Sequence, residues 1–336
     1  MAAFTLLVTA NAFRESAATA EPPVHAAGGE VLYTPRMGPL TPEELVPYLS
    51  QADAVVAATD PYVGEVLDAC PRLRAVVRWG TGYDSVDLAA CTARGVVACN
   101  APGLVVEAVA DYVFGAMLSM TRQLPHQLDV MRAGSWEEVR GVEVYRKTIG
   151  LVGFGAIGKA VARRARGFDC RILAFDPYLD PETLRSFGAE PATLEQVFEG
   201  ADFVSIHASL TPETRGLVNE GLLRRMKPTA YLINAARGPL VDEADLVRAL
   251  TENWIAGAAI DAHNVEPPRP DHPLRHLTNC LATPHSAFNT IEAAAATNAA
   301  VVEQAVAVLR GERPRFALNP EVFDTPQFRE RAPLLS

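Results

Sequence analysis

The sequence predicts an α/β fold built from two doubly wound parallel sheets, and three observations predict it. The chain has 336 residues, more than one hydrophobic core usually organises. Its N-terminal third alternates short apolar runs with helical segments, which is typical of a parallel sheet covered by helices. Further on, residues 148–176 place an apolar run, a glycine-rich turn, a helical segment and a second apolar run in succession. We therefore expect two domains, each organised around its own sheet.

The first domain is expected to contain five strands. They are the apolar runs Phe4–Val8, Glu30–Tyr33, Ala54–Ala57, Leu73–Arg78 and Val96–Cys99. A helix is expected to begin after Thr41, because Thr41-Pro42-Glu43-Glu44 combines a capping box with proline in the first turn. The alternation of strands and helices indicates a flavodoxin-like unit with helices on both faces of its sheet.

The second domain, residues 101–287, is expected to be inserted into the first. After the break Asn100-Ala101-Pro102-Gly103, residues 105–122 predict a long helix that is apolar nearly all round and therefore buried. Strands are expected at Thr148–Val152, Cys170–Phe175, Phe203–Ile206, Ala230–Ile233, Ala256–Ile260 and Leu281–Ala282. An alanine-rich helix, residues 293–309, then returns the chain to the first domain, and the segment from Arg315 onward looks irregular. The first domain is thus residues 1–100 plus 288–336, and two chain crossings predict a hinge with the active cleft between the domains.

The glycine-rich turn has the spacing of a phosphate-binding turn. Gly153, Gly155 and Gly158 follow the apolar run in G-x-G-x-x-G order. The first glycine permits a tight turn, the second lets a pyrophosphate approach the backbone, and the third lets the helix pack close to the strand. The free N–H groups of that helix, expected over residues 159–167, favour bound phosphate. The turn therefore predicts a dinucleotide site.

Asp176 ends the second strand of this unit, where a carboxylate can accept hydrogen bonds from the two ribose hydroxyls. Pro177 and Tyr178 follow it, with no arginine beside them to accommodate a 2′-phosphate. The site is therefore expected to bind NAD in preference to NADP.

Composition and charge exclude several classes of protein. A net charge of −10 argues against nucleic acid or an anionic membrane as the main partner. The most apolar stretch, residues 104–120, is interrupted by Glu107 and Asp111, so we expect no membrane span, and the N-terminus lacks the features of a secretion signal. The five cysteines form no C-x-x-C pair, which favours buried thiols in a reducing cytoplasm over disulfides or a metal site.

Three polar residues follow strands of the second domain. Arg237, Glu266 and His285 come after the third-last, second-last and last strand, and the carboxyl ends of parallel strands line one crevice. His285 can exchange a proton with a hydroxyl or carbonyl, Glu266 can stabilise the protonated imidazole, and Arg237 can hold a carboxylate through two parallel bonds. Taken singly, each has a plainer interpretation: a structural histidine, a solvated loop acid and a surface ion pair. Their shared placement favours a carbonyl/alcohol redox site.

A fourth motif, residues 78–84 (RWGTGYD), lies in the first domain. It follows a strand, and its two glycines expose successive backbone N–H groups that can form an anion-binding nest. An ordinary glycine turn is the alternative interpretation. If the motif faces the other three, it would bind a substrate carboxylate.

These motifs resemble those of the NAD-dependent D-isomer-specific 2-hydroxyacid dehydrogenases. The matching pieces are RWGTGYDSVD, NAPG, GLVGFGAIG, FDPY, INAARGPLVDE, GAAIDAHNVEPP and TPHSA. The resemblance implies that Arg237, Glu266 and His285 are catalytic. It implies substrate contacts from Arg78, Gly80, Thr81, Gly82 and Phe288, the last as an apolar wall. The implied cofactor contacts are Gly153, Gly155, Ala156, Ile157, Gly158, Asp176, Thr214, Ala235, Ala236, Arg237, Asp261 and His285.

The resemblance also implies a function. It is hydride transfer between nicotinamide and C2 of a small D-2-hydroxy or 2-keto acid, in a cytoplasmic homodimer that assembles through the NAD-binding domain. RWGTG and EPP resemble the phosphoglycerate dehydrogenases, but the acidic loop at Trp136-Glu137-Glu138 weakens the case for a phosphorylated substrate. The substrate is therefore left as a 3-phosphoglycerate, hydroxypyruvate or glyoxylate type. Two alternatives remain: an NAD(H)-sensing protein like the C-terminal-binding-protein co-repressors, and a phosphite-type dehydrogenase.

Overall fold

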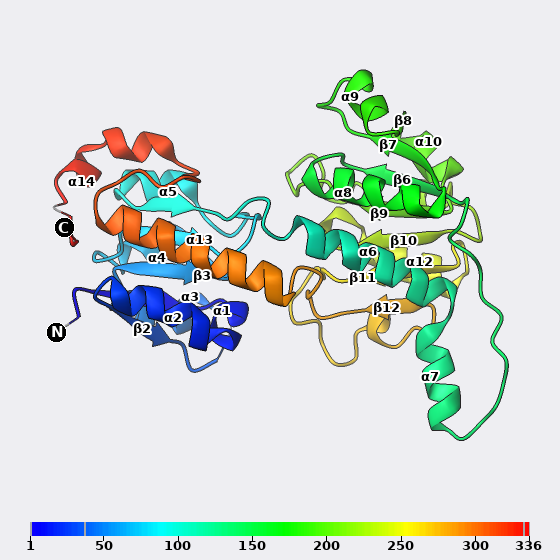
Figure 1. Cartoon of the computed structure of the whole chain (residues 1–336), viewed down its shortest axis with the longest axis horizontal. Coiled ribbons are helices and arrows are strands. Elements are labelled where there is room, and N and C mark those ends of the chain that lie inside the picture. Colours follow the sequence, from blue (N-terminus) through cyan, green and yellow to red (C-terminus); the bar gives the residue numbers. More distant parts are fainter. Residues whose placement is uncertain (1, 37, 332, 336) are drawn as a thin grey trace. The chain divides into compact units, whose positions relative to one another are not determined.

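The computed structural model describes residues 2–36, 38–331 and 333–335, and the chain divides into two compact units (Figure 1). Unit 1 comprises Met1–Val105 and Asn289–Ser336, and unit 2 comprises Val106–Phe288. Each unit contains one parallel sheet flanked by helices, which confirms the predicted fold class.

Unit 1 is built on a five-stranded sheet in the order β2-β1-β3-β4-β5, and each neighbouring pair is parallel. The strands are β1 (Phe4–Val8), β2 (Gly29–Tyr33), β3 (Ala54–Ala57), β4 (Ala75–Arg78) and β5 (Val97–Cys99). This is the flavodoxin-like order that the sequence predicts. Strands β3, β4 and β5 are buried on both faces because helices cover both.

The helices of unit 1 form two layers. One layer contains α1 (Asn11–Glu15), α2 (Ala17–Ala26) and α13 (Ile291–Leu309), and α13 packs on β3 and β4. The other contains α3 (Pro42–Leu49), α4 (Gly64–Asp68) and α5 (Leu88–Ala93). The capping box predicted at Thr41 is present, since its side chain accepts from the N–H of Glu44 and its own N–H donates to the Glu44 carboxylate. The chain then continues into η4 (Pro320–Asp324) and α14 (Pro326–Arg329).

Unit 2 is built on a seven-stranded parallel sheet in the order β12-β11-β10-β9-β6-β7-β8. Its strands are β6 (Thr148–Val152), β7 (Arg171–Phe175), β8 (Glu190–Pro191), β9 (Phe203–Ile206), β10 (Tyr231–Asn234), β11 (Gly257–Ile260) and β12 (Cys280–Ala282). Alternate residues of β6 face opposite cores: Leu151 contributes to one and Val152 to the other. The sheet therefore sits between two hydrophobic layers.

Helices cover each face of this sheet. One layer holds α6 (Val106–Thr121), α8 (Ala156–Ala165) and α9 (Pro181–Ser186), and the other holds α10 (Leu194–Gly200), α11 (Glu220–Leu223) and α12 (Glu243–Thr251). Short 3-10 turns complete the unit: η1 (Arg166–Phe168), η2 (Gly238–Leu240) and η3 (Pro273–Arg275). Among the described residues, no helix is both long and apolar enough to cross a membrane.

One predicted boundary and one segment predicted to be irregular need correction, and one helix was not predicted. The helix after the glycine turn begins at Ala156, three residues before the predicted start, because Gly155 serves directly as its N-cap. Helix α7 (Leu124–Arg132) lies in a stretch for which the sequence predicted no element, and none of its residues is buried. The segment after Asn319 is not irregular throughout, since Thr325 caps α14 by accepting from the N–H of Phe328.

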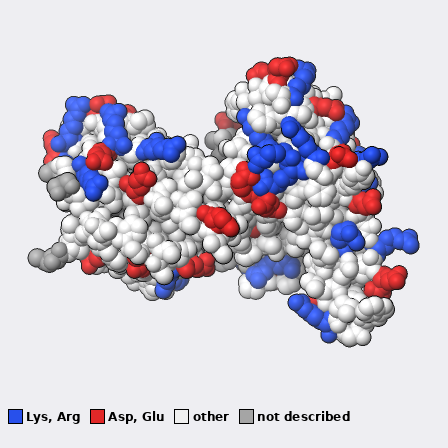
Figure 2. Space-filling view, viewed as in Figure 1, with Lys and Arg blue, Asp and Glu red and all other residues white. Residues whose placement is uncertain are grey.

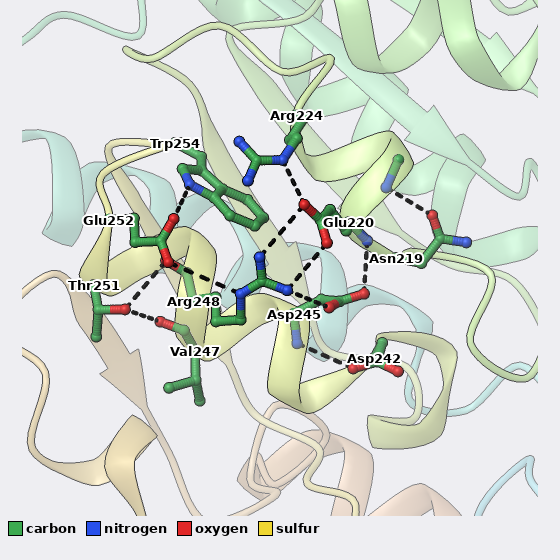
Figure 3. Close-up of polar contacts among 11 residues, drawn as sticks. Asn219, Glu220, Arg224, Asp242, Asp245, Val247, Arg248, Thr251, Glu252 and Trp254 are labelled. Carbon is green, nitrogen blue, oxygen red and sulfur yellow. Dashed lines mark hydrogen bonds and ion pairs between the residues drawn. The ribbon is translucent and has the colours of Figure 1, made fainter.

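Ion pairs hold neighbouring helices together on the surface. Glu107 of α6 lies within 2.8 Å of both Arg163 and Arg164 of α8, and Figure 2 shows acidic and basic side chains side by side over these helices. On the other layer, Glu220 pairs with Arg224 and Arg248, and the Trp254 ring lies against both guanidinium groups (Figure 3). These contacts join α11 to α12 beneath the strand ends.

Candidate active site

The glycine turn connects β6 to α8. Gly153 has φ +91°, and a Cβ there would lie 2.7 Å from the backbone of His207 and Ala208. A Cβ on Gly158 would lie 2.5 Å from the carbonyl oxygen of Gly153. A Cβ on Gly155, in contrast, would meet no protein atom within 4 Å. The first and third glycines are thus required by the fold itself, while the second leaves open space above the backbone.

Helix α8 begins at this open position. Gly155 is its N-cap and supplies no side-chain acceptor, and Ala156 and Ile157 form its first turn. The N–H groups of that turn therefore remain available to an anionic group, which the helix dipole also favours. A dinucleotide pyrophosphate fits these donors and the open space at Gly155.

Asp176 lies just after β7, beside the turn. One carboxylate oxygen accepts from the N–H of Phe154 at 2.8 Å and the other from the N–H of Tyr178 at 2.9 Å. The two bonds fix the orientation of the carboxylate next to the glycine turn, and each oxygen keeps a second lone pair for another donor. The arrangement suits a diol such as a ribose.

The segment after β10 positions Arg237. The side chain of Asn234 accepts from the N–H of Ala236 at 3.1 Å and donates to the carbonyl of Arg237 at 2.8 Å, so one buried amide shapes the whole turn. Gly238 follows, where a Cβ would lie 2.1 Å from the backbone carbon of His263. Only glycine therefore lets the segment carrying Arg237 approach the segment that leads to Glu266.

His285 and Glu266 form a hydrogen-bonded pair. The Nδ1 atom of His285 lies 2.8 and 2.9 Å from the two oxygens of Glu266, and both side chains are about one-quarter exposed. Burial alone would raise the pKa of Glu266, but the hydrogen bond and charge of His285, together with the N–H of His263, lower it overall. The pair leaves Nε2 as the ring nitrogen able to exchange a proton with another molecule.

A buried carboxylate, Asp261, holds the loop that carries His285. One oxygen accepts from the Thr283 hydroxyl at 2.6 Å and from the N–H of Ser286 at 2.9 Å. The other accepts from the N–H of Ala287 at 2.8 Å, and the N–H of His285 donates to the Asp261 carbonyl at 2.9 Å. These bonds enforce φ +50° at His285, a left-handed conformation that costs energy for a residue with a Cβ. A direct cofactor contact from Asp261 stays a prediction.

Two further residues support this loop, and neither was singled out from the sequence. The hydroxyl of Tyr112, on α6, lies 2.5 Å from that of Thr283. Burial raises the pKa of Tyr112 to about 12, and Thr283 already donates to Asp261, so Tyr112 donates to Thr283. His263 holds the Thr283 carbonyl through Nε2 at 2.9 Å and donates its N–H to Glu266 at 3.0 Å. His263 stands two residues after Asp261, a position that could have drawn attention; Tyr112 carries no local signal.

The remaining predicted residues lie in several places. Phe288 packs edge-on to His285 with ring centroids 5.8 Å apart, and Ala235 lies in the turn before Arg237. Thr214 lies in the loop after β9, where its hydroxyl donates to the Ser209 carbonyl at 2.7 Å. It is placed on the same strand-end side of the sheet, without a hydrogen bond to the His285 loop among those described.

The fourth motif follows β4 in unit 1. Arg78 is buried, and its guanidinium donates to the carbonyls of Ala57 and Trp79. Gly80 has φ +119°, and Asn100 donates to the carbonyl of Thr81 at 2.8 Å. The Trp79 indole donates to Asn298 of α13 at 2.7 Å. The turn through Gly82 is thus fixed by unit 1 itself.

Comparison with known proteins identifies the family. Residues 114–287 match the model of the D-isomer specific 2-hydroxyacid dehydrogenase, NAD binding domain. A glyoxylate reductase of Korarchaeum cryptofilum is 39% identical over 291 residues, covering 84% of this chain and 88% of that one. The chain belongs to the D-isomer specific 2-hydroxyacid dehydrogenases. The predicted family and its cofactor, NAD, are confirmed.

Two more members of the family, one a sequence relative and one a solved structure, are similar to this chain. A D-3-phosphoglycerate dehydrogenase of Methanocaldococcus jannaschii is 37% identical over 284 residues, covering 83% of this chain but 54% of that one. The apo structure of D-lactate dehydrogenase from Escherichia coli superposes with a TM-score of 0.82 at 27% identity, covering 94% of this chain and 99% of that one. This 2-hydroxyacid dehydrogenase therefore shares its two-unit architecture with solved members of the family, and its unit 2 contains the NAD-binding domain.

Proposed function

We propose that this chain reduces a small unphosphorylated 2-keto acid of the glyoxylate or hydroxypyruvate type with NADH. The hydrogen-bonded His285–Glu266 pair, beside the strand ends of the NAD-binding sheet, carries the proposal. Bound NADH supplies the hydride that reaches C2 of the keto acid. The protonated His285 gives a proton from Nε2 to the carbonyl oxygen, while Glu266 stabilises the imidazolium through Nδ1. In the reverse direction neutral His285 takes the hydroxyl proton.

Arg237 is proposed to bind the substrate and polarise its carbonyl. Its turn is fixed by Asn234 and packed against the His263 segment, so its guanidinium starts from a defined place. A planar guanidinium can bind a carboxylate or keto oxygen bidentately, which lysine cannot reproduce. The turn of Arg78, Gly80, Thr81 and Gly82 is proposed to bind the substrate carboxylate from unit 1, and Phe288 to limit its side chain. Unit 1 is accordingly proposed as the substrate-binding domain.

One observation favours an unphosphorylated substrate over 3-phosphoglycerate. The loop after α7 presents Trp136, Glu137 and Glu138 on the surface, and acids repel a phosphate.

A cytoplasmic homodimer is proposed as the working form. Helix α7 has no buried residue and exposes Leu124, Leu128 and Met131 at helical spacing, and Trp136 beyond it is 85% exposed. Such an apolar stripe on a surface helix indicates a protein partner, and a second copy satisfies it with a symmetric contact. The five cysteines are free thiols, which fits a reducing compartment. Leu128→Glu should convert the dimer to a monomer in light scattering.

A steady-state comparison tests the proposal. Glyoxylate, hydroxypyruvate and 3-phosphohydroxypyruvate are offered with NADH, and kcat/KM is expected to be lowest for the phosphorylated acid. Arg237→Lys should retain NADH affinity and lose most of the turnover. If no keto acid is reduced although NADH binds tightly, the NAD(H)-sensing alternative replaces this proposal. Turnover of phosphite alone would favour the phosphite-type dehydrogenase.

A further inference from the structure

A basic hollow lies at the amino ends of the strands in unit 1. Asp53 and Arg74 precede β3 and β4, Ala3 precedes β1, and the C-terminal residues Arg331 and Leu334 close the other side. The hollow measures about 440 Å³. It therefore lies at the amino ends of the strands, whereas Arg78 and the turn through Gly82 lie at the carboxyl end of β4.

Arginine side chains dominate its described lining. Arg72, Arg74 and Arg331 contribute three guanidinium groups, and Asp53 contributes one carboxylate. That carboxylate is already shared, because the same oxygen accepts from Arg72 and from the N–H of Thr5, each at 2.9 Å. The carboxylate of Asp53 is therefore engaged by Arg72 and Thr5 and forms no described bond with Arg331.

Arg331 is oriented without being neutralised in its described hydrogen bonds. Its guanidinium donates to the carbonyls of Leu73 at 2.6 Å and Pro71 at 3.3 Å, which carry no net charge. Burial lowers the pKa of Arg331, and the neighbouring charge of Arg74 lowers it further. Two guanidinium groups are therefore close enough to repel each other at a place where solvent screens them incompletely.

We propose that this hollow is a binding site for a small divalent anion, a phosphate or a dicarboxylate. Arg331 lines the hollow and in its described hydrogen bonds donates only to uncharged carbonyls, and guanidinium groups bind both classes of anion bidentately. It would add a contact between the sheet and the C-terminal segment, which Arg331 already joins to Leu73 and Pro71 and which the N–H of Leu334 joins to the Leu309 carbonyl of α13 at 2.9 Å. Anion binding there would stabilise unit 1 without using the proposed catalytic residues.

The test uses inorganic phosphate and, in a second arm, malonate, with the whole chain saturated with NADH. Sodium chloride at matched ionic strength corrects for screening. Calorimetric titration and thermal unfolding are compared for wild type, Arg331→Gln, Arg72→Gln and the control Arg329→Gln. Arg329 is close in sequence but pairs with exposed Asp324 and does not line the hollow. Arg72 is 56% exposed, so its replacement is expected to fold.

Wild type and Arg329→Gln are expected to bind phosphate saturably and to unfold at a higher temperature with phosphate than with chloride. Arg331→Gln should weaken binding at least tenfold, and Arg72→Gln should weaken it less, while both keep wild-type turnover in phosphate-free buffer. Binding of malonate but not phosphate would assign the site to dicarboxylates. The proposal is overturned if chloride matches both anions, or if Arg331→Gln and Arg72→Gln titrate like wild type; either result leaves the proposed dehydrogenase activity untouched.

Discussion

The glycine turn and the histidine loop of unit 2 obtain their geometry in different ways. The turn is contiguous: Gly153, Gly155 and Gly158 act through missing side chains and the backbone angles that they permit. The histidine loop is assembled from distant residues, and its geometry depends on side-chain hydrogen bonds centred on Asp261. A surface for binding can thus be made from local backbone, whereas a proton-transfer group needs partners brought together by the fold.

This contrast separates two kinds of loss on mutation. Changes in the turn should weaken NADH binding or the fold, and changes in the loop should reduce turnover while NADH still binds. The largest expected effect is at His285. His285→Ala removes the proposed proton donor, and general acid–base groups contribute roughly 10²–10⁴-fold, so turnover should fall by about a thousandfold. NADH affinity, measured by fluorescence titration, should stay near wild type. A large loss of affinity would show that the histidine loop also contributes to NADH binding and would contradict the separation of the two regions.

A matched pair of substitutions in the glycine turn separates its effect on stability from its effect on NADH binding. Gly153→Ala places a Cβ against the backbone of His207 and Ala208 at positive φ, so unfolding should become easier by roughly 1–3 kcal/mol or more. Gly155→Ala meets no protein atom and should leave stability unchanged while weakening NADH, because the open space is proposed to hold the pyrophosphate. Denaturant unfolding and NADH titration give the comparison. Equal stability losses in both variants would contradict it.

His207 lies behind the turn and should give unit 2 an acid-sensitive stability. Its Nε2 is buried without a partner among the described residues, and burial lowers its pKa to about 4. The unfolded imidazole binds a proton near pH 6.5 and the folded one does not, so stability falls as pH drops between these values. From pH 6.5 to 5 the loss should be about 1.6 kcal/mol, because the slope approaches 1.4 kcal/mol per pH unit only once the unfolded imidazole is mostly protonated.

The measurement is the difference in denaturant midpoint and slope between wild type and His207→Gln across this range. The variant cannot titrate there, so its curve should be flatter by the stated amount. Parallel pH dependences would show that the imidazole reaches water or a partner when folded.

Asp176 should have a smaller effect, confined to the choice of cofactor. Its carboxylate is fixed by the N–H groups of Phe154 and Tyr178, where a 2′-phosphate would be repelled. Asp176→Ala should narrow the preference for NADH over NADPH by about tenfold, the scale of one unit-charge interaction near the surface. The ratio of kcat/KM for the two cofactors checks this. Wild type that uses both equally would contradict the assigned role.

How much the sequence could predict follows the same division. β1 and β6 have the predicted bounds, and the turn lies where its spacing places it, because burial and glycine spacing act over a few neighbouring residues. The pairing of His285 with Glu266 was predicted from strand-end placement and is observed. The supporting contacts from Tyr112 and His263 could not be deduced, since they depend on how α6 and the Asp261 loop pack. Helix α7 was missed because it is only nine residues long and contains a proline, which gives a weak helical pattern in the sequence.

The most direct test of the central claim, that Glu266 and the Asp261-anchored loop prepare His285 for proton transfer, is the pH profile of keto-acid reduction. Reduction takes a proton from His285, so activity should fall on the alkaline side. Glu266→Gln keeps the shape and removes the charge that pairs with the imidazole, so the alkaline limb should move to lower pH. Asp176→Ala, which leaves the pair intact, should show no such shift. Superimposable profiles for wild type and Glu266→Gln would contradict the account.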